Sequence, residues 1–162
     1  MIVVANAGPL IALARIGQLV VLPSLYREIR LPEAVRKEVV VAGEGRAGSE
    51  EIEGAEWVRW DCVCDKVGVG LLSDRLDAGE SEAIVLAIEE NADLLLIDEE
   101  RGRRVAESRG IAVVGTLGTL VLAKKRGILE RVTPHLDALL ASGFRMVPAL
   151  YDAVLQLADE TV

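Results

Sequence analysis

Cysteine and histidine are nearly absent from this chain of 162 residues. The two cysteines are Cys62 and Cys64, and the one histidine is His135. A structural zinc site normally needs more sulfur and nitrogen ligands than these three side chains supply. We therefore expect reduced thiols, a cytoplasmic protein, and a fold that does not depend on zinc.

Long apolar runs and aromatic side chains are also missing. No apolar run reaches the length of a membrane-spanning helix, and the N-terminus lacks the basic start of a signal peptide. We expect no association with a membrane. Aromatic residues make up 3% of the chain and hydrophobic residues 51%, so the core must consist mainly of Val, Leu, Ile and Ala. The length predicts a single domain over residues 1–162.

Basic residues are outnumbered by acidic ones, and the net charge is -8. This charge argues against broad, nonspecific binding to nucleic acids or to anionic membranes. It does not exclude an enzyme that acts on nucleic acid, because contacts with phosphate depend on local charge and a bound metal ion offsets acidic groups.

Short apolar segments alternate with helical patterns along the chain. The expected strands are residues 1–5, 26–31, 57–60, 94–97 and 111–114. The expected helices are residues 10–16, 33–41, 78–88, 99–109, 117–125, 134–141 and 148–158. Residues 42–56 read as a surface loop with a partly helical end, residues 61–73 as loop or strand fragments, and residues 144–147 as a link or short strand. This alternation predicts an α/β fold with a parallel sheet covered by helices on both faces.

Glu80 occupies an unusual position in its helix. On a helical wheel it shares an arc with Ala83, Ile84 and Ala87. A carboxylate among apolar residues is costly unless a cation pairs with it or it binds a ligand. Pairing with Arg or Lys is the simpler interpretation for one such residue. However, the next strand ends in a second carboxylate, Asp98, and ligands of open α/β sheets bind beyond the carboxyl ends of the strands.

Glu38 repeats the pattern in the helix that follows Pro32. It lies near the centre of an apolar arc with Val35 and Val39. A salt bridge to an arginine explains this helix equally well when it is taken alone. Two such carboxylates in one small domain favour a shared acidic centre.

The candidate site therefore comprises Glu38, Glu80 and Asp98, with Asn6 at the end of the first strand. Oxygen ligands with few histidines or thiols favour a hard cation, Mg²⁺ or Mn²⁺. Such an ion can orient a phosphodiester, activate water and stabilise the departing oxygen. Asn6 can ligate or donate a hydrogen bond through its amide, but it brings no charge.

Further polar residues lie near these positions in the sequence. We expect Asp77 to cap the helix and Glu82 to be solvated, whereas Glu99, next to Asp98, is a possible ligand. Basic residues could flank the site and meet phosphates, although a solvated helix face explains each of them alone. These weaker candidates for RNA binding are Arg101, Arg103 and Arg104.

The order of motifs resembles the PIN-domain superfamily, in particular its small prokaryotic branch of unknown function, which is related to the toxin ribonucleases of toxin–antitoxin pairs. The resemblance covers nearly the whole chain and lies in the order and spacing of the motifs together. The matching segments are residues 3–13, 32–39, 79–84, 96–99 and 115–118.

This resemblance implies a three-layer α/β/α sandwich with a central parallel sheet. It also implies an acidic centre for Mg²⁺ or Mn²⁺ and hydrolysis of single-stranded RNA, commonly by a homodimer restrained by an antitoxin protein. The family's four acidic positions fall on Asn6, Glu38, Glu80, and either Asp98 or Glu99. The helical wheels select Glu38 and Glu80 independently of the resemblance.

Asn6 departs from the family pattern, in which the acid of the first strand is usually Asp. Loss of one negative ligand weakens binding of a divalent ion, because affinity depends on ligand charge. Three hypotheses follow. The chain is a ribonuclease that tolerates Asn6 and uses a metal-bound water as nucleophile, a catalytically weakened PIN-like module for binding or regulation, or an α/β protein whose acids form structural ion pairs.

Overall fold

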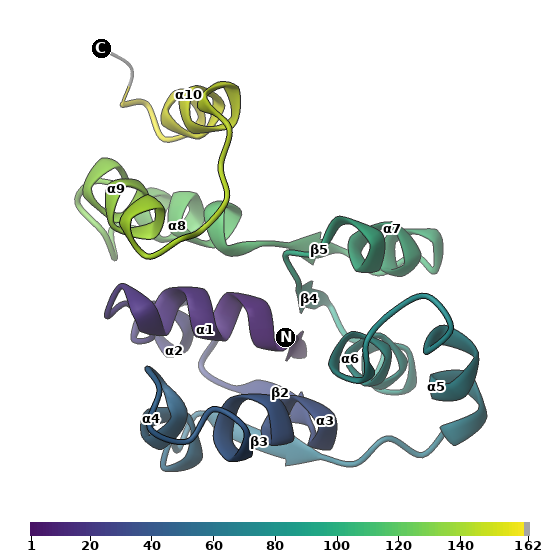
Figure 1. Ribbon diagram of the computed structural model, residues 1–162. Helices are drawn as coiled ribbons and strands as arrows, with labels where there is room; N and C mark the ends of the chain where they lie inside the picture. Colours follow the sequence, from purple (N-terminus) through teal and green to yellow (C-terminus); the bar gives the residue numbers. More distant parts are fainter. Residues whose placement is uncertain (161–162) are drawn as a thin grey trace.

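The strands form one parallel sheet, as the sequence predicts. The computed structural model describes residues 1–160 and contains a five-stranded sheet of order β3-β2-β1-β4-β5, in which each pair of neighbours is parallel (Figure 1). The strands are β1 (Val3–Ala5), β2 (Ile29–Pro32), β3 (Val58–Asp61), β4 (Leu94–Leu96) and β5 (Val113–Val114). The crossover connections place β1 beside β4, so segments far apart in sequence meet in the middle of the sheet.

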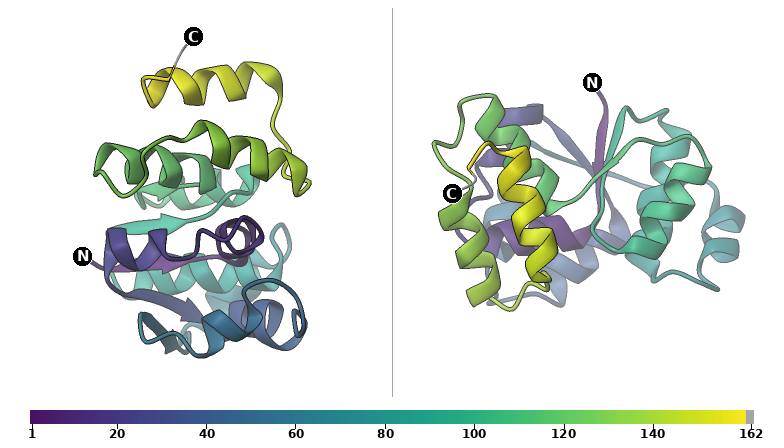
Figure 2. Two further views of the ribbon diagram at one scale, coloured as in Figure 1. Left: turned by 90° about the vertical axis from the view of Figure 1, so that its left-hand side faces the viewer. Right: turned by 90° about the horizontal axis from the view of Figure 1, so that it is seen from above.

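Helices connect these strands and cover both faces of the sheet. On one side lie α1 (Ala7–Arg15), α2 (Val21–Tyr26), α8 (Thr116–Lys125), α9 (Thr133–Ala141) and α10 (Pro148–Leu157). On the other side lie α5 (Lys66–Leu72), α6 (Ala78–Glu89) and α7 (Glu100–Ser108). Beside β2 and β3 lie α3 (Glu33–Arg36), the π-helix η1 (Lys37–Val41) and α4 (Ser49–Glu53). The α10 helix is the outermost layer and packs on α8 (Figure 2).

The alternation of side chains along the strands divides the core in two. Val3 and Ala5 of β1 pack into the cluster with α1, α2 and α8, whereas Val4 packs into the cluster with α6. In β4, Leu95 belongs to the second cluster and Leu96 to the first. Successive residues of a strand point to opposite faces, so apolar strands of this length need helices on both sides. The three-layer α/β/α sandwich is therefore confirmed.

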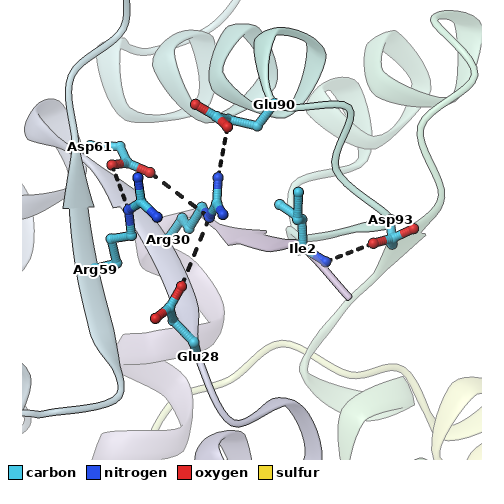
Figure 3. Close-up of polar contacts among 7 residues, drawn as sticks. All are labelled: Ile2, Glu28, Arg30, Arg59, Asp61, Glu90 and Asp93. Atoms are coloured by element: carbon cyan, nitrogen blue, oxygen red, sulfur yellow. Dashed lines mark hydrogen bonds and ion pairs between the residues drawn. The ribbon is translucent and has the colours of Figure 1, made fainter.

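An ion-pair network holds the end of α6 that lies farthest from Glu80. Arg30 of β2 donates to Glu90 at 2.7 Å and lies 4.0 Å from both Glu28 and Asp61 (Figure 3). Asp61 also pairs with Arg59 at 3.0 Å. Because only 15% of the Arg30 side chain is exposed, these carboxylates neutralise a largely buried cation. The network joins β2, β3 and the end of α6.

Two segments differ from expectation. Residues 61–73, expected as loop or strand fragments, contain α5, although Gly68 and Gly70 lower helix propensity; the Asp65 side chain accepts from the Gly68 amide and caps this helix. The helix predicted over residues 33–41 changes from α to π geometry at Lys37. Residues 144–147 form a link, which is one of the two predicted alternatives, and contain no strand. No helix within residues 1–160 is long and apolar enough to cross a membrane.

Candidate active site

The candidate site residues gather at the carboxyl edge of the sheet. Ala5 is paired with Leu96, and Leu96 with Val114, so the residues that follow these three strands lie side by side. The Asn6 amide donates to the carbonyl of Leu96 at 2.9 Å and extends the pairing by one step. Parallel pairing thus brings together the ends of β1, β4 and β5, which are distant in sequence.

Asn6 occupies the N-cap position of α1 without capping the helix. An N-cap Asn normally accepts a hydrogen bond from a backbone amide of the first helical turn. Here the side chain makes no such bond, and its Oδ1 atom is buried without a partner within residues 1–160. Only 7% of Asn6 is exposed. A buried carbonyl oxygen without a donor is costly, which indicates that this oxygen is available to a ligand.

Glu38 reaches the same place from the start of η1. In this wide turn the amide of Ala42 donates to the carbonyl of Lys37 at 2.7 Å, five residues back. A Cβ atom placed on Gly79 would stand 3.1 Å from Oε1 of Glu38 and 3.2 Å from Oδ1 of Asn6. The two oxygens therefore converge over the backbone of Gly79. Partial burial and the charge of Asp77 raise the pKa of Glu38 above its ordinary value.

Glu80 is the most deeply buried acid of the site. It stands in the first turn of α6, whose N-cap Asp77 accepts from the Glu80 amide at 2.8 Å, as predicted. Only 7% of Glu80 is exposed, and its Oε2 atom has no hydrogen-bond partner within residues 1–160. Burial, a hydrogen bond with Asp77, and the charges of Asp77 and Glu99 raise the pKa of Glu80 to about 8. Without a bound cation, Glu80 is therefore largely protonated at neutral pH.

The salt-bridge interpretation of these two acids is not supported. Within residues 1–160, neither Glu38 nor Glu80 forms an ion pair with a Lys or Arg side chain. Glu38 is exposed to solvent, whereas Glu80 is buried, and a buried carboxylate without a cationic partner either takes up a proton or binds a cation. Oε1 of Glu38 approaches Gly79 together with the free oxygen of Asn6, whereas Oε2 of Glu80 lies toward α7, 3.0 Å from a Cβ placed on Gly102. This arrangement favours the shared centre over structural ion pairs.

Asp98 is held in place by a residue that the sequence analysis did not select. Its Oδ1 accepts from the amide of Thr116 at 2.7 Å, and its Oδ2 accepts from the hydroxyl of Thr116 at 2.6 Å. Thr116 is fully buried at the first position of α8. Asp98 also faces the start of α1, since a Cβ on Gly8 would stand 3.6 Å from its Oδ2. A threonine directly after a strand and a glycine was the available signal.

The surrounding acids have different roles. Glu99 is exposed, and its charge contributes to the raised pKa of Glu80, so Glu99 lies on the Glu80 side of the site. The expectation that Glu82 is solvated is wrong: it is half-buried, and its Oε1 accepts from the amide of Ala34 at 3.1 Å. Glu82 thereby binds the start of α3, the helix that continues into η1 and Glu38.

The three arginines of α7 differ in their contacts. Arg101 donates to the carbonyl of Arg75 at 3.2 Å, and Arg104 pairs with Glu100 at 2.6 Å, both on exposed surface. Arg103 is half-buried and donates to the carbonyl of Ile97 at 3.0 Å. Arg103 also lines a cavity together with Asp98. Of the three, Arg103 has the strongest structural support as a site residue.

The candidate ligand atoms are oxygens, the type of atom that a hard cation binds. Within residues 1–160, no three side chains of His, Cys, Asp or Glu are arranged to hold a metal ion by themselves. The unpartnered buried oxygens of Asn6 and Glu80, with Oε1 of Glu38 converging on Asn6, are amide and carboxylate atoms. Mg²⁺ and Mn²⁺ prefer such oxygens, and Mg²⁺ commonly keeps several waters and takes few protein ligands.

The comparison with protein families agrees with this geometry. A family model described as a PIN domain (DUF3368) matches residues 2–160, and the chain belongs to this family. PIN domains generally include metal-dependent nucleases, so the kind of reaction that the family supports is hydrolysis. No curated protein and no solved structure matches the chain.

Proposed function

We propose that this protein is a divalent-metal-dependent endoribonuclease directed at single-stranded RNA and related to toxin ribonucleases. The observation that carries the proposal is the pair of buried, unpartnered oxygens, Asn6 Oδ1 and Glu80 Oε2, at the carboxyl edge of the sheet. Glu80 forms no ion pair with a Lys or Arg side chain within residues 1–160, and the family includes metal-dependent nucleases. A divalent ion would bind both the acidic site, which needs a cation, and the phosphodiester, which carries negative charge.

Each side chain has a distinct task in this proposal. Asn6, Glu38 and Glu80 would hold Mg²⁺ or Mn²⁺, and Asp98, positioned by Thr116, would complete the ligand set directly or through water. The ion, when bound, would orient the phosphodiester, lower the pKa of water and offset charge on the departing oxygen. Glu80 must release its proton when the cation binds, because its raised pKa keeps it protonated in the metal-free protein.

A second function is favoured by one observation, the neutral side chain of Asn6. An amide supplies an oxygen but no charge, so the site carries one negative charge fewer than the usual family site. In this alternative, the protein is a weakened PIN-like module that binds RNA or a regulatory partner with little cleavage. The toxin-like assignment also includes a homodimer and an antitoxin protein as proposed partners.

The decisive experiment is cleavage of an end-labelled single-stranded RNA in Mn²⁺. EDTA is the metal-free control, Glu80→Gln removes a proposed ligand, and Glu107→Gln is the matched control because Glu107 is exposed in the last turn of α7. Duplex RNA of the same sequence tests strand preference. We expect cleavage by the wild type and by Glu107→Gln, and loss of cleavage in EDTA and in Glu80→Gln.

Two results would count against this proposal. Cleavage that persists in both EDTA and Glu80→Gln would show that the acids described here are not the catalytic centre. Mn²⁺ binding without cleavage, in folded protein, would instead support the weakened module. Light scattering on the same preparation measures the proposed dimer.

A further inference from the structure

Two cavities lie on either side of Asp98, and the same aromatic residue lines both. One has a volume of about 360 Å³ and is lined by Asp98, Arg103, Phe144 and Arg145, among others. The other has a volume of about 340 Å³ and is lined by Asp98, Arg15 and Phe144, among others. Asp98 and Phe144 are thus common to both cavities, and each cavity has at least one arginine in its wall.

Both apolar and cationic side chains line the larger cavity. Its apolar part includes Val114, Leu117 and Leu150, and its cationic part consists of Arg103 and Arg145. Apolar side chains beside guanidinium groups suit a nucleotide, whose base is planar and whose phosphate is anionic. In the whole chain acidic residues outnumber basic ones, with 26 Asp and Glu against 18 Lys and Arg, so arginines placed around these two cavities represent a local departure from the overall charge.

Two of these arginines are available to a ligand. Arg15 and Arg145 are exposed, and neither takes part in an ion pair within residues 1–160. Arg15 lies in the last turn of α1, and Arg145 lies in the link between α9 and α10. They therefore belong to different elements and line different cavities, each of which also includes Asp98.

Phe144 is the aromatic residue that lines these cavities, whereas the others are placed or engaged elsewhere. Trp60 lies under the guanidinium of Arg36, 5.5 Å from the ring centre, and Tyr151 donates to Asp137. Tyr26 is buried, and Trp57 packs against the core near β3. Phe144 also packs against this core cluster, but it lines both cavities as well. It is half-buried, and its amide donates to the carbonyl of Leu139 at 3.0 Å, which fixes its backbone to the end of α9.

We propose that Phe144 is the base-stacking residue of the RNA-binding surface, with Arg145 and Arg15 contacting phosphates in the two cavities on either side of Asp98. This inference rests on the proposed function and adds the residues that select single-stranded RNA. A base can stack on an aromatic ring only when it is free of its own neighbours in a helix, as in single strands. Because stacking tolerates every base, the strand would be bound with weak sequence preference.

The test measures binding of a short single-stranded RNA in EDTA, where the proposed cleavage does not occur. The RNA carries 2-aminopurine, whose fluorescence falls when the base stacks, and a terminal dye reports the dissociation constant by anisotropy. The stacking variant is Phe144→Leu, which keeps an apolar side chain, and Phe144→Trp restores a stacking surface. The phosphate-contact variant is Arg145→Gln, and its matched control is Arg109→Gln, an exposed arginine beside the groove between α5, α6 and α7.

We expect Phe144→Leu to weaken binding about 5- to 100-fold and to abolish the change in 2-aminopurine fluorescence, whereas Phe144→Trp retains both. Arg145→Gln should reduce the magnitude of the slope of log K against log salt concentration by about 0.7. Arg109→Gln should leave this slope unchanged. Unfolding midpoints verify that each variant is folded. Wild-type affinity and stacking in folded Phe144→Leu would overturn the inference, as would the absence of RNA binding by the wild type.

Failure of the inference is distinguishable from failure of the proposed function. Binding that depends on Phe144, without cleavage in Mn²⁺, would support this surface and reject the nuclease. Cleavage that depends on Glu80, with no effect of Phe144→Leu on binding, would support the nuclease and reject this surface.

Discussion

Oδ1 of Asn6 and Oε1 of Glu38 converge on the same point, the backbone of Gly79, from two different elements. A Cβ on Gly79 would lie 3.2 Å from the first oxygen and 3.1 Å from the second. Asn6 follows β1, and Glu38 belongs to η1, so 31 residues separate two oxygens that approach the same turn of α6. Substitutions that change the charge at position 6 or the free space at position 79 therefore test the site most directly.

Asn6→Asp should strengthen binding of Mn²⁺ roughly 10-fold or more, because ligand charge sets affinity for a divalent cation. In EDTA the same change should lower the unfolding temperature, because a buried negative charge then lies beside Glu38 without a cation. Titration calorimetry and thermal unfolding measure the two effects. Asn91→Asp, a change of the same charge at an exposed site after α6, is the control. Equal affinities for Mn²⁺ in Asn6→Asp and the wild type would exclude Asn6 as a ligand.

Gly79→Ala should separate metal binding from stability. A methyl group here would lie in close contact with both Glu38 and Asn6, so we expect weaker binding of Mn²⁺. Alanine also has a higher helix propensity than glycine, by about 1 kcal/mol, which limits any loss of stability in α6. Gly70→Ala is the matched control, because nothing lies within 4 Å of a Cβ at that helical position. Unchanged Mn²⁺ affinity in Gly79→Ala would place the ion elsewhere.

Stability of the metal-free protein should fall as pH rises. The pKa of Glu80 is raised from 4.5 to about 8, so the folded state binds more protons than the unfolded state between these pH values. The free energy of unfolding therefore decreases through this window, by about 2 kcal/mol or more. Glu80→Gln should flatten this dependence, stabilise the protein at pH 8 in EDTA, and abolish stabilisation by Mn²⁺. Denaturant titrations at several pH values provide the measurement, and an unchanged slope in the variant would contradict it.

Thr116→Val should impair catalysis through the position of Asp98. Valine has nearly the shape of threonine but removes the hydroxyl that donates to Oδ2 of Asp98 at 2.6 Å. We expect a stability loss of about 1–2 kcal/mol and a cleavage rate about 10-fold lower. Thr116→Ser, which keeps the hydroxyl, should recover most of the rate. If the serine variant were as slow as the valine variant, the hydrogen bond would not explain the loss.

Glu160 should contribute to stability at the far end of the molecule. Burial opposes its charge, but hydrogen bonds from Thr133, from the Val132 amide and from Lys124 lower the pKa of Glu160 to about 2. Because the folded pKa lies below the ordinary value of 4.5, this stabilisation is present above pH 4.5 and is lost as pH falls toward about 2. Glu160→Gln should lower the free energy of unfolding by about 1–3 kcal/mol at pH 7.

Asp159→Asn is the control for Glu160→Gln. Asp159 is exposed and has a φ angle of 57°, a conformation that Asn also adopts readily. Chemical denaturation at pH 7 compares the two variants with the wild type. If Glu160→Gln lost no more stability than Asp159→Asn, the contacts of Glu160 with α9 and Lys124 would carry no net stabilisation.

Local sequence patterns were sufficient to predict much of the fold and to select two of the acids as candidates. Glu38 and Glu80 stood out because a helix repeats every 3.6 residues, so an acid on the apolar arc is visible without a structure. The apolar segment before Asp98 indicated a buried strand for a similar reason. The pattern failed for α5, where two glycines concealed a helix that Asp65 caps.

The amino-acid order alone determined the α/β class, the parallel sheet and the placement of acids at strand and helix ends, because these features follow from short-range periodicity. Tertiary structure decided which acids lack a partner. Glu82 is bound by an amide of α3, whereas Glu80 has no cation beside it within residues 1–160. Such partners come from elements that are distant in sequence, and no local pattern records which elements become neighbours when the sheet forms.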